Sequence, residues 1–201
     1  MIKVFHAPRS RSMRVVWMCE EMELPYQVEP ASLMAPSEAF LKANPTRTLP
    51  VVIDGDVVLT ESVAILQYLG AKYGPTPLVP QPQDKGYADY LQFLVYGEAS
   101  LAAGLTPLVR ARFMAPDDQK ENWTLKNNAE VFVRQLKLVD QQLAKGDYLA
   151  GDHFTAADIS VGYALAFGNF LGLDGGYSDA IKAYQDRITS RPAFQRASAV
   201  E

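Results

Sequence analysis

The chain has 201 residues, of which 48% are hydrophobic and 21% charged, and its formal net charge is −4. This length is enough for one large domain or two small ones with a real core. The weak negative charge, spread over the whole chain, excludes a basic nucleic-acid-binding surface and an acidic tail. No apolar run reaches the roughly 20 residues of a membrane span. The single cysteine excludes an internal disulfide and a cysteine metal cluster, and it indicates a cytoplasmic protein.

Hydrophobic periodicity predicts a small α/β domain over the first 75 residues. Short alternating runs indicate strands, and apolar residues at helical spacing indicate helices. Two apolar runs around an Asp-Gly-Asp turn at 54–56 indicate a hairpin. The expected elements are strands at 2–5 and 26–29, helices at 13–23 and 37–43, the hairpin, and a helix at 62–72. A small mixed sheet covered by helices follows.

A proline-rich stretch, residues 74–82, is the clearest boundary in the chain. Its four prolines cannot continue a helix and predict an extended, semi-rigid linker. The remainder is predicted to be helical, with segments at 83–109, 119–143, 155–170, 179–190 and 192–200. We therefore expect an α/β domain at 1–75, a linker at 76–85 and an all-helical domain at 86–201.

The best local folding signal in the helical part is a capping motif that begins at Phe154. Thr155 can cap the helix, Asp158 can bond back from the third helical position, and Phe154 can pack onto Ile159. This is a signal for a helix start and not for catalysis.

Two dipeptides in the hairpin region are candidates for ligand binding. Leu49-Pro50 stands where the first hairpin strand begins, and proline cannot donate to a sheet ladder. If this bond is cis, the Leu49 backbone would face outward, where an extended peptide can pair with it. Glu61-Ser62 opens the next helix, where a hydroxyl and free N–H groups suit an anion. Each dipeptide alone also fits an ordinary sheet edge or helix end.

In this order and spacing, the Thr48-Leu49-Pro50 run, the hairpin, Glu61-Ser62, the proline-rich linker and the capping motif closely resemble the glutathione S-transferase family. The resemblance covers essentially the whole chain. It implies a thioredoxin-like α/β domain followed by an all-α domain. It also implies an enzyme that stabilises the thiolate of glutathione and conjugates it to electrophilic hydrophobic molecules, a detoxification role, a cytoplasmic homodimer, and no metal.

Two other functions fit the same resemblance. One is a binding or regulatory protein of this fold without turnover. The other is a specialised glutathione-dependent isomerase, dehalogenase, lyase or peroxidase. The presence of Pro50, Glu61 and Ser62 argues against the first of these, because members without turnover often lose parts of the glutathione site.

In the family, the thiolate is held by a Tyr, Ser or Cys in the first strand–helix turn, and here that turn has neither tyrosine nor cysteine. Matching residues 10–14 to the theta/delta-like bacterial pattern Ser-X-X-X-Arg places Ser10 at the catalytic position. A registration that is longer by one residue places Arg9 there instead. Arg11 and Ser12 remain alternatives, although Ser12 has the better claim as a helix N-cap.

The rest of the glutathione site follows from the resemblance. The backbone of Leu49, in the Thr48-Leu49-Pro50 run, would pair with the cysteinyl backbone of the tripeptide. Glu61 and Ser62 would hold its γ-glutamyl amino and carboxylate groups. Arg47 would meet the glycyl carboxylate or would be a solvated loop arginine.

An apolar second-substrate site is expected between the two domains, open because no long C-terminal lid is expected. The candidate wall residues are Tyr96, Leu101, Leu105, Leu108, Phe113 and Trp123, although most such residues belong to cores. His6 and His153 are expected to be a strand-end and a loop histidine, and two isolated histidines do not indicate a metal site.

Overall fold

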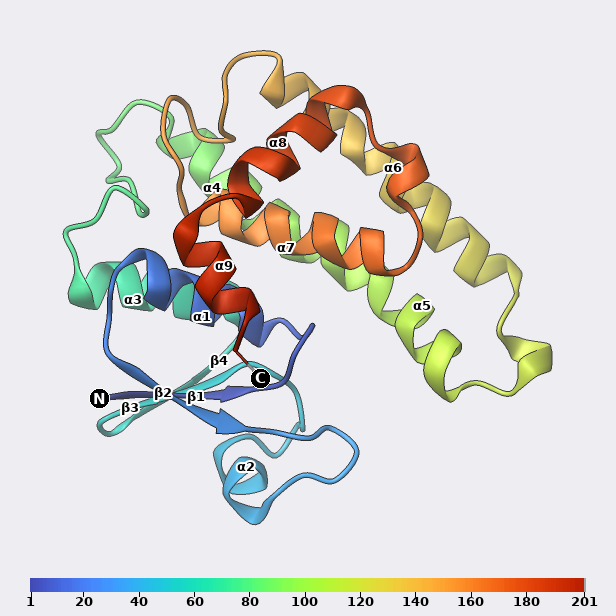
Figure 1. The fold of residues 1–201 in the computed structure, drawn as a ribbon, viewed down its shortest axis with the longest axis horizontal. Coiled ribbons are helices and arrows are strands. Elements are labelled where there is room, and N and C mark those ends of the chain that lie inside the picture. Colours follow the sequence, from blue (N-terminus) through green and yellow to red (C-terminus); the bar gives the residue numbers. More distant parts are fainter. Residues whose placement is uncertain (201) are drawn as a thin grey trace. The chain divides into compact units, whose positions relative to one another are not determined.

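The computed structural model describes residues 1–200, which form two compact units (Figure 1). The first unit comprises residues 1–79 together with the chain from residue 189 onward, and the second comprises residues 80–188. The sequence assigned the segment after residue 189 to the helical domain. The structure differs, because this segment packs against a helix of the first unit.

The first unit is built on a mixed four-stranded sheet with the order β2-β1-β3-β4. Its strands are β1 (Ile2–His6), β2 (Tyr26–Pro30), β3 (Val51–Asp54) and β4 (Val57–Thr60). β1 pairs with β2 in parallel and with β3 in antiparallel orientation, with Val4 opposite both Val28 and Val52. This is the α/β architecture that the sequence predicts.

Helices cover both faces of this sheet. They are α1 (Ser12–Glu21), α2 (Glu38–Ala43), α3 (Ser62–Tyr73) and α9 (Pro192–Ser198). Figure 1 shows α1 and α3 on one side of the sheet and α2 on the other. Phe5 and Val51 pack with Phe40 of α2, with the Phe5 and Phe40 rings 5.7 Å apart. Since neighbouring strand residues point to opposite faces, the buried Val4 and Val52 belong to the α1 and α3 side.

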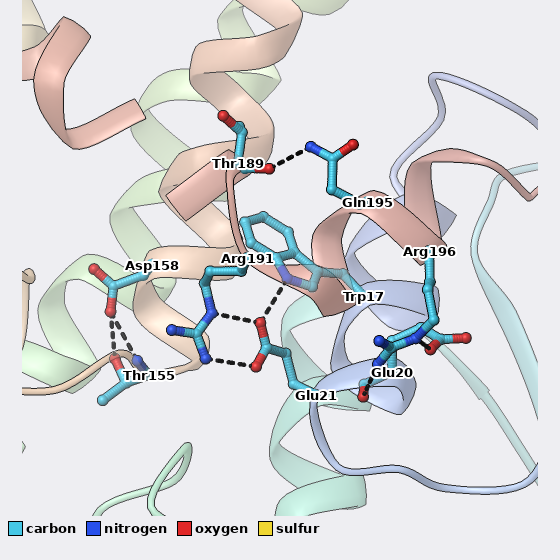
Figure 2. Close-up of polar contacts among 9 residues, drawn as sticks. All are labelled: Trp17, Glu20, Glu21, Thr155, Asp158, Thr189, Arg191, Gln195 and Arg196. Atoms are coloured by element: carbon cyan, nitrogen blue, oxygen red, sulfur yellow. Dashed lines mark hydrogen bonds and ion pairs between the residues drawn. The ribbon is translucent and has the colours of Figure 1, made fainter. Parts of the chain in front are cut away.

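The C-terminal helix α9 is attached to α1 by charge and by aromatic packing. The Arg191 guanidinium donates two hydrogen bonds to the Glu21 carboxylate, at 2.6 and 2.7 Å, as Figure 2 shows. The Trp17 indole N–H donates to the same carboxylate, and its ring packs edge-on against Phe194. Such bidentate pairs and aromatic contacts were not visible in the sequence pattern, since residues some 170 positions apart form them.

The hairpin end of the sheet is tied to α3 through Asp54. This carboxylate is 5% exposed and accepts hydrogen bonds from Tyr68, Lys72 and Tyr73, at 2.9, 2.7 and 2.7 Å. The Lys72 ammonium, helped by the two hydroxyls, holds the pKa of Asp54 below its usual value and outweighs the effect of burial.

This cluster gives a prediction about acid stability. Because the folded-state pKa of Asp54 is depressed, its contribution is present above the unfolded pKa of about 3.9 and is lost as the pH falls through the folded value. Asp54→Asn should lower the free energy of unfolding at neutral pH, and the deficit should shrink as the solution is acidified. Urea unfolding at several pH values measures this. Asp56→Asn, at an exposed position of the same turn, is the control, and an equal and pH-independent deficit in both variants would contradict the prediction.

The second unit is all-helical. Its helices are α4 (Tyr87–Tyr96), α5 (Ala103–Met114), α6 (Trp123–Leu143), α7 (Ala156–Phe170) and α8 (Asp179–Thr189). A π-helical turn (Gly97–Ala102) lies between α4 and α5, and short 3-10 turns lie at 117–119 and 174–176. In residues 1–200, no helix combines the length and apolarity that crossing a bilayer requires.

The helix that the sequence predicts over 83–109 differs from the structure in three ways. It begins later, at Tyr87, a π-helical turn separates α4 from α5, and α5 continues to Met114. At this turn Gly97 packs so closely on α7 that an added Cβ would lie 2.5 Å from the Ser160 hydroxyl oxygen. Pro107, inside α5, lacks the N–H that would bond one turn back. The close packing of Gly97 and the missing donor of Pro107 lie at and just after the π-helical turn, and hydrophobic periodicity records neither.

The predicted capping box of Thr155 and Asp158 is present at the start of α7. The Asp158 carboxylate is fully buried and accepts from the Thr155 N–H and hydroxyl, at 2.8 and 3.1 Å (Figure 2). It also accepts from the Leu149 N–H and the Tyr184 hydroxyl, at 3.0 and 2.9 Å. The motif therefore joins three segments of the second unit, the start of α7, the chain at Leu149 and α8, and is more than a local helix stop.

Candidate active site

The turn between β1 and α1 brings the candidate thiolate donors together. β1 ends at His6, and the Ser10 N–H donates to the Ala7 carbonyl at 3.1 Å, which closes the turn. Arg9 takes a positive φ of 63°, a conformation uncommon for residues with a side chain. Ser10 is half-buried, whereas Ser12 and His6 are buried.

These side chains form a continuous polar chain. The Ser10 and Ser12 hydroxyl oxygens are 2.6 Å apart, and the Ser12 oxygen lies 2.8 Å from Nδ1 of His6. The Ser12 oxygen also accepts from the Ala7 N–H, and the Ser10 oxygen accepts from the Ser12 N–H, both at 3.3 Å. Burial lowers the pKa of His6, and a hydrogen bond to the backbone of Val200 offsets part of this effect. Burial therefore favours the neutral form of the His6 ring.

The expected N-cap role of Ser12 is wrong. Arg11 occupies the N-cap position without a side-chain cap, and Ser12 is the first helical residue. The physical reason is that the Ser10 hydroxyl already accepts the Ser12 N–H, while the Ser12 hydroxyl turns back toward His6. Arg9 is exposed and Arg11 half-buried. Ser10 is the half-buried end of a chain of hydroxyls that leads to His6, and its role as the thiolate donor remains a prediction.

The loop before β3 places the Leu49-Pro50 pair. The bond between these residues is cis, as the peptide-pairing hypothesis requires. The buried Asn44 orders the loop, because its side-chain amide donates to the Thr48 carbonyl at 2.8 Å and to the Thr48 hydroxyl at 3.0 Å. Arg47 is exposed and takes a positive φ of 56°. The sequence indicated Asn44 only as the end of a helix and did not indicate its ordering role.

The start of α3 has the backbone and side-chain features of an anion site. Glu61 adopts φ 66° and ψ 105°, a sparsely populated conformation for a residue with a side chain, and its carbonyl accepts from the Ile65 N–H. Such backbone strain is typical of binding and catalytic positions. Ser62 is 2% exposed, and its hydroxyl accepts from Nη1 of the fully buried Arg14 at 3.0 Å. The positive end of the helix and the Ser62 hydroxyl can together hold a carboxylate.

Arg14 and His6 are functional candidates that the sequence did not assign to the site. Arg14 served only to register the Ser-X-X-X-Arg pattern, yet it supports Ser62 from 48 positions away. His6 was expected to be an isolated strand-end histidine. In the sequence, His6 stands directly before a turn with two serines, and this position could have indicated a contact with them. Whether the contact forms depends on how the turn closes.

The six candidates for the second-substrate wall lie in the second unit and differ in exposure. Leu101 and Leu105 are fully buried, and Tyr96 is half-buried with its hydroxyl donating to the Gln135 carbonyl at 2.9 Å. Leu108 is also half-buried. Phe113 is 62% exposed and stacks on Phe170, and Trp123 is 77% exposed. The wall remains a prediction.

Comparison with known proteins agrees with this geometry. Residues 4–77 match the N-terminal domain of glutathione S-transferases, and residues 105–195 match their C-terminal domain. The chain is 30% identical to glutathione S-transferase 3 of Schizosaccharomyces pombe, over 98% of this chain and 87% of the relative.

Solved structures show the same fold. A glutathione transferase from Methylococcus capsulatus matches with a TM-score of 0.87 and 25% identity, over 98% of this chain and 97% of the other. A sphingomonad glutathione S-transferase, solved in complex with glutathione, matches with a TM-score of 0.84 and 26% identity, over 98% and 96%. With two matching domain families and full-length relatives, the chain belongs to the glutathione S-transferase family.

Proposed function

We propose that this protein binds glutathione in its first unit, stabilises the glutathione thiolate with the Ser10 hydroxyl, and transfers the tripeptide to hydrophobic electrophiles. The single observation that supports this most strongly is the Ser10–Ser12 hydroxyl pair, 2.6 Å apart, in the β1–α1 turn at the N-terminus of α1. The relatives named above are glutathione transferases.

The chemical task is to make a thiol ionise near neutral pH. A free thiol has a pKa of about 8.5, and lowering it by about two units requires roughly 2.7 kcal/mol of selective stabilisation of the anion. A hydroxyl that donates to the sulfur, together with the positive end of a helix, supplies stabilisation of this kind. The thiolate is the nucleophile, and no protein side chain is covalently modified.

The remaining groups orient the tripeptide. The Leu49 backbone would pair with the cysteinyl backbone, and Glu61 and Ser62 would bind the γ-glutamyl amino and carboxylate groups. Arg47, exposed beside Thr48, would meet the glycyl carboxylate. Among the wall candidates, the partly exposed Tyr96, Leu108, Phe113 and Trp123 are the better ones for the electrophile. A homodimer, a cytoplasmic location and a role in detoxification complete the proposal, and light scattering of the purified protein tests the dimer.

The first experiment is a calorimetric titration with glutathione, paired with ultraviolet detection of bound thiolate across pH. Binding with a depressed thiol pKa is the expected result. Binding without that depression would favour a carrier or regulatory protein. A protein that binds no glutathione would contradict the proposal and leave the fold unaffected.

Replacing Ser62 tests the γ-glutamyl subsite. Ser62→Ala removes one hydrogen bond to a carboxylate and the acceptor of the Arg14 Nη1 hydrogen bond. A hydrogen bond to a charged group contributes about 1.5–3 kcal/mol, so the KM for glutathione should rise about tenfold to a hundredfold. The kcat should change much less, because Ser62 holds substrate and transition state alike.

The control for this variant is Ser198→Ala, which removes an exposed hydroxyl on α9 of the same unit. Steady-state kinetics at varied glutathione should separate the two variants. If Ser62→Ala lowered kcat with an unchanged KM, the assignment of Ser62 to substrate binding would be wrong.

A further inference from the structure

Phe113, one of the exposed candidates for the second-substrate wall, belongs to a small cluster that contains a cation. Phe113 is 62% exposed, and its ring stacks on that of Phe170, with the centroids 5.9 Å apart and the planes inclined by 13°. The guanidinium carbon of Arg112 lies 5.8 Å from the centre of the Phe113 ring and 5.5 Å from that of Phe170. We call these three side chains, from the ends of α5 and α7, the Arg112 cluster.

The guanidinium is held against the end of α7. Its Nη1 donates to the Phe170 carbonyl at 3.0 Å. The last carbonyls of a helix need donors from outside the helix, and a cation is favoured at this end of the helix dipole. This bond and the two ring contacts hold the Arg112 side chain in one place but do not neutralise its charge.

The charge of Arg112 has no acidic partner. Across residues 1–200, no carboxylate comes within ion-pairing distance of this exposed guanidinium. A guanidinium has five N–H donors, and the Phe170 carbonyl takes one of them. The remaining donors can bind an anion, and their planar arrangement suits a carboxylate, which can accept two parallel hydrogen bonds.

A ligand that uses the whole cluster has both an aromatic ring and a negative charge. A planar ring can pack on the exposed part of Phe113 and extend the Phe113–Phe170 stack. An anionic group on that ring then lies beside a cation that is already held in place, which favours it over a neutral or cationic group. An aliphatic ligand would use only the apolar surface.

We propose that Arg112 is a specificity-determining residue of the second-substrate site, which prefers aromatic electrophiles that carry a carboxylate or another anionic group. This rests on the proposed function, in which Phe113 is a wall candidate. With a chlorinated ring, the glutathione sulfur forms a bond to the ring carbon, the carbon–chlorine bond breaks, and chloride leaves with the electron pair. Arg112 binds the anionic group of the ring and takes no part in these bonds.

The test compares two electrophiles that differ in charge. Chlorodinitrobenzoate carries a carboxylate, and chlorodinitrobenzene is neutral. Dividing each kcat/KM by the rate constant of the uncatalysed reaction with glutathione removes the difference in intrinsic reactivity. In the full-length protein, Arg112→Gln removes the charge, Arg112→Glu reverses it, and Phe113→Ala removes the ring. Arg110→Gln is the control, because this exposed arginine lies two residues earlier in α5 and therefore on another face of the helix.

The wild-type protein should have the higher normalised kcat/KM with the benzoate. Arg112→Gln should lower kcat/KM for the benzoate about fivefold, mainly through KM, which is the upper end for a partly exposed charge pair. Its kcat/KM for the neutral electrophile and its KM for glutathione should stay unchanged. Arg112→Glu should lose more with the benzoate, and Phe113→Ala should lose with both electrophiles. High salt should weaken the wild-type preference for the benzoate.

Three results would overturn the inference. These are equal losses with both electrophiles in Arg112→Gln, a loss of benzoate preference in Arg110→Gln as large as in Arg112→Gln, and a wild-type protein without that preference. A protein that conjugates neither electrophile would overturn the proposed function itself. Calorimetric titration with unreactive dinitrobenzoate then decides the inference separately: weaker binding by Arg112→Gln than by wild type supports an anion site at Arg112, and equal binding rules it out.

Discussion

Ser10→Ala should raise the pKa of the bound glutathione thiol by about one to two units and lower kcat at neutral pH about a hundredfold. The reason is that alanine removes the half-buried hydroxyl at the outer end of the chain from His6. The direction of the pKa shift gives a second test. Because the thiol of the variant ionises at higher pH, its kcat should recover as the pH is raised. The whole pH–rate profile should move to higher pH and show no additional ionisation.

The measurement is kcat across pH together with ultraviolet absorbance of the bound thiolate. Arg9→Ala and Arg11→Ala are the informative comparisons, because the sequence left both arginines as alternatives at this turn. Their profiles should stay close to wild type. If Ser10→Ala keeps the wild-type profile and Arg9→Ala takes the shifted one, the thiolate is held by a charge and the assignment to Ser10 is wrong.

Asp158→Ala should be the most destabilising substitution in the helical unit, with a loss of about 3–5 kcal/mol in the free energy of unfolding. The carboxylate is fully buried and accepts four hydrogen bonds, from two groups of Thr155 and from Leu149 and Tyr184. Its removal leaves these donors without an acceptor in the interior, which costs more than the bonds themselves contribute. Burial raises the pKa of Asp158, and the four donors oppose this.

Urea unfolding, followed by far-ultraviolet circular dichroism, measures the loss. Asp152→Ala, at an exposed position of the same loop region, should change stability by less than about 0.5 kcal/mol. Tyr184→Phe removes one of the four donors and leaves no unpaired hydroxyl behind. It should lower the free energy of unfolding by about 1 kcal/mol. If Asp158→Ala lowered the free energy of unfolding by only about 1 kcal/mol or less, the capping motif would be only a local helix stop.

The two predictions differ in how far the sequence anticipated them. The Thr155–Asp158 motif is a local pattern, and local patterns fix helix starts because the partners are neighbours in the chain. The sequence alone did not show that Leu149 and Tyr184 donate to the same carboxylate, since these bonds depend on how helices pack. The same applies to Ser12. A serine before a helix suggests a cap, and only the closed turn shows that Ser10 takes the Ser12 N–H.

The sequence by itself determined the fold class, the hairpin, the capping motif and the positions of Leu49-Pro50 and Glu61-Ser62, because periodicity, turn chemistry and capping act over a few residues. Tertiary structure alone decided the partners: His6 with Ser12, Arg14 with Ser62, Asn44 with Thr48, and the C-terminal helix with α1. It also decided where a predicted helix takes a π-helical turn. Buried polar side chains must be satisfied by whatever group the packing brings near, and no local pattern specifies that group.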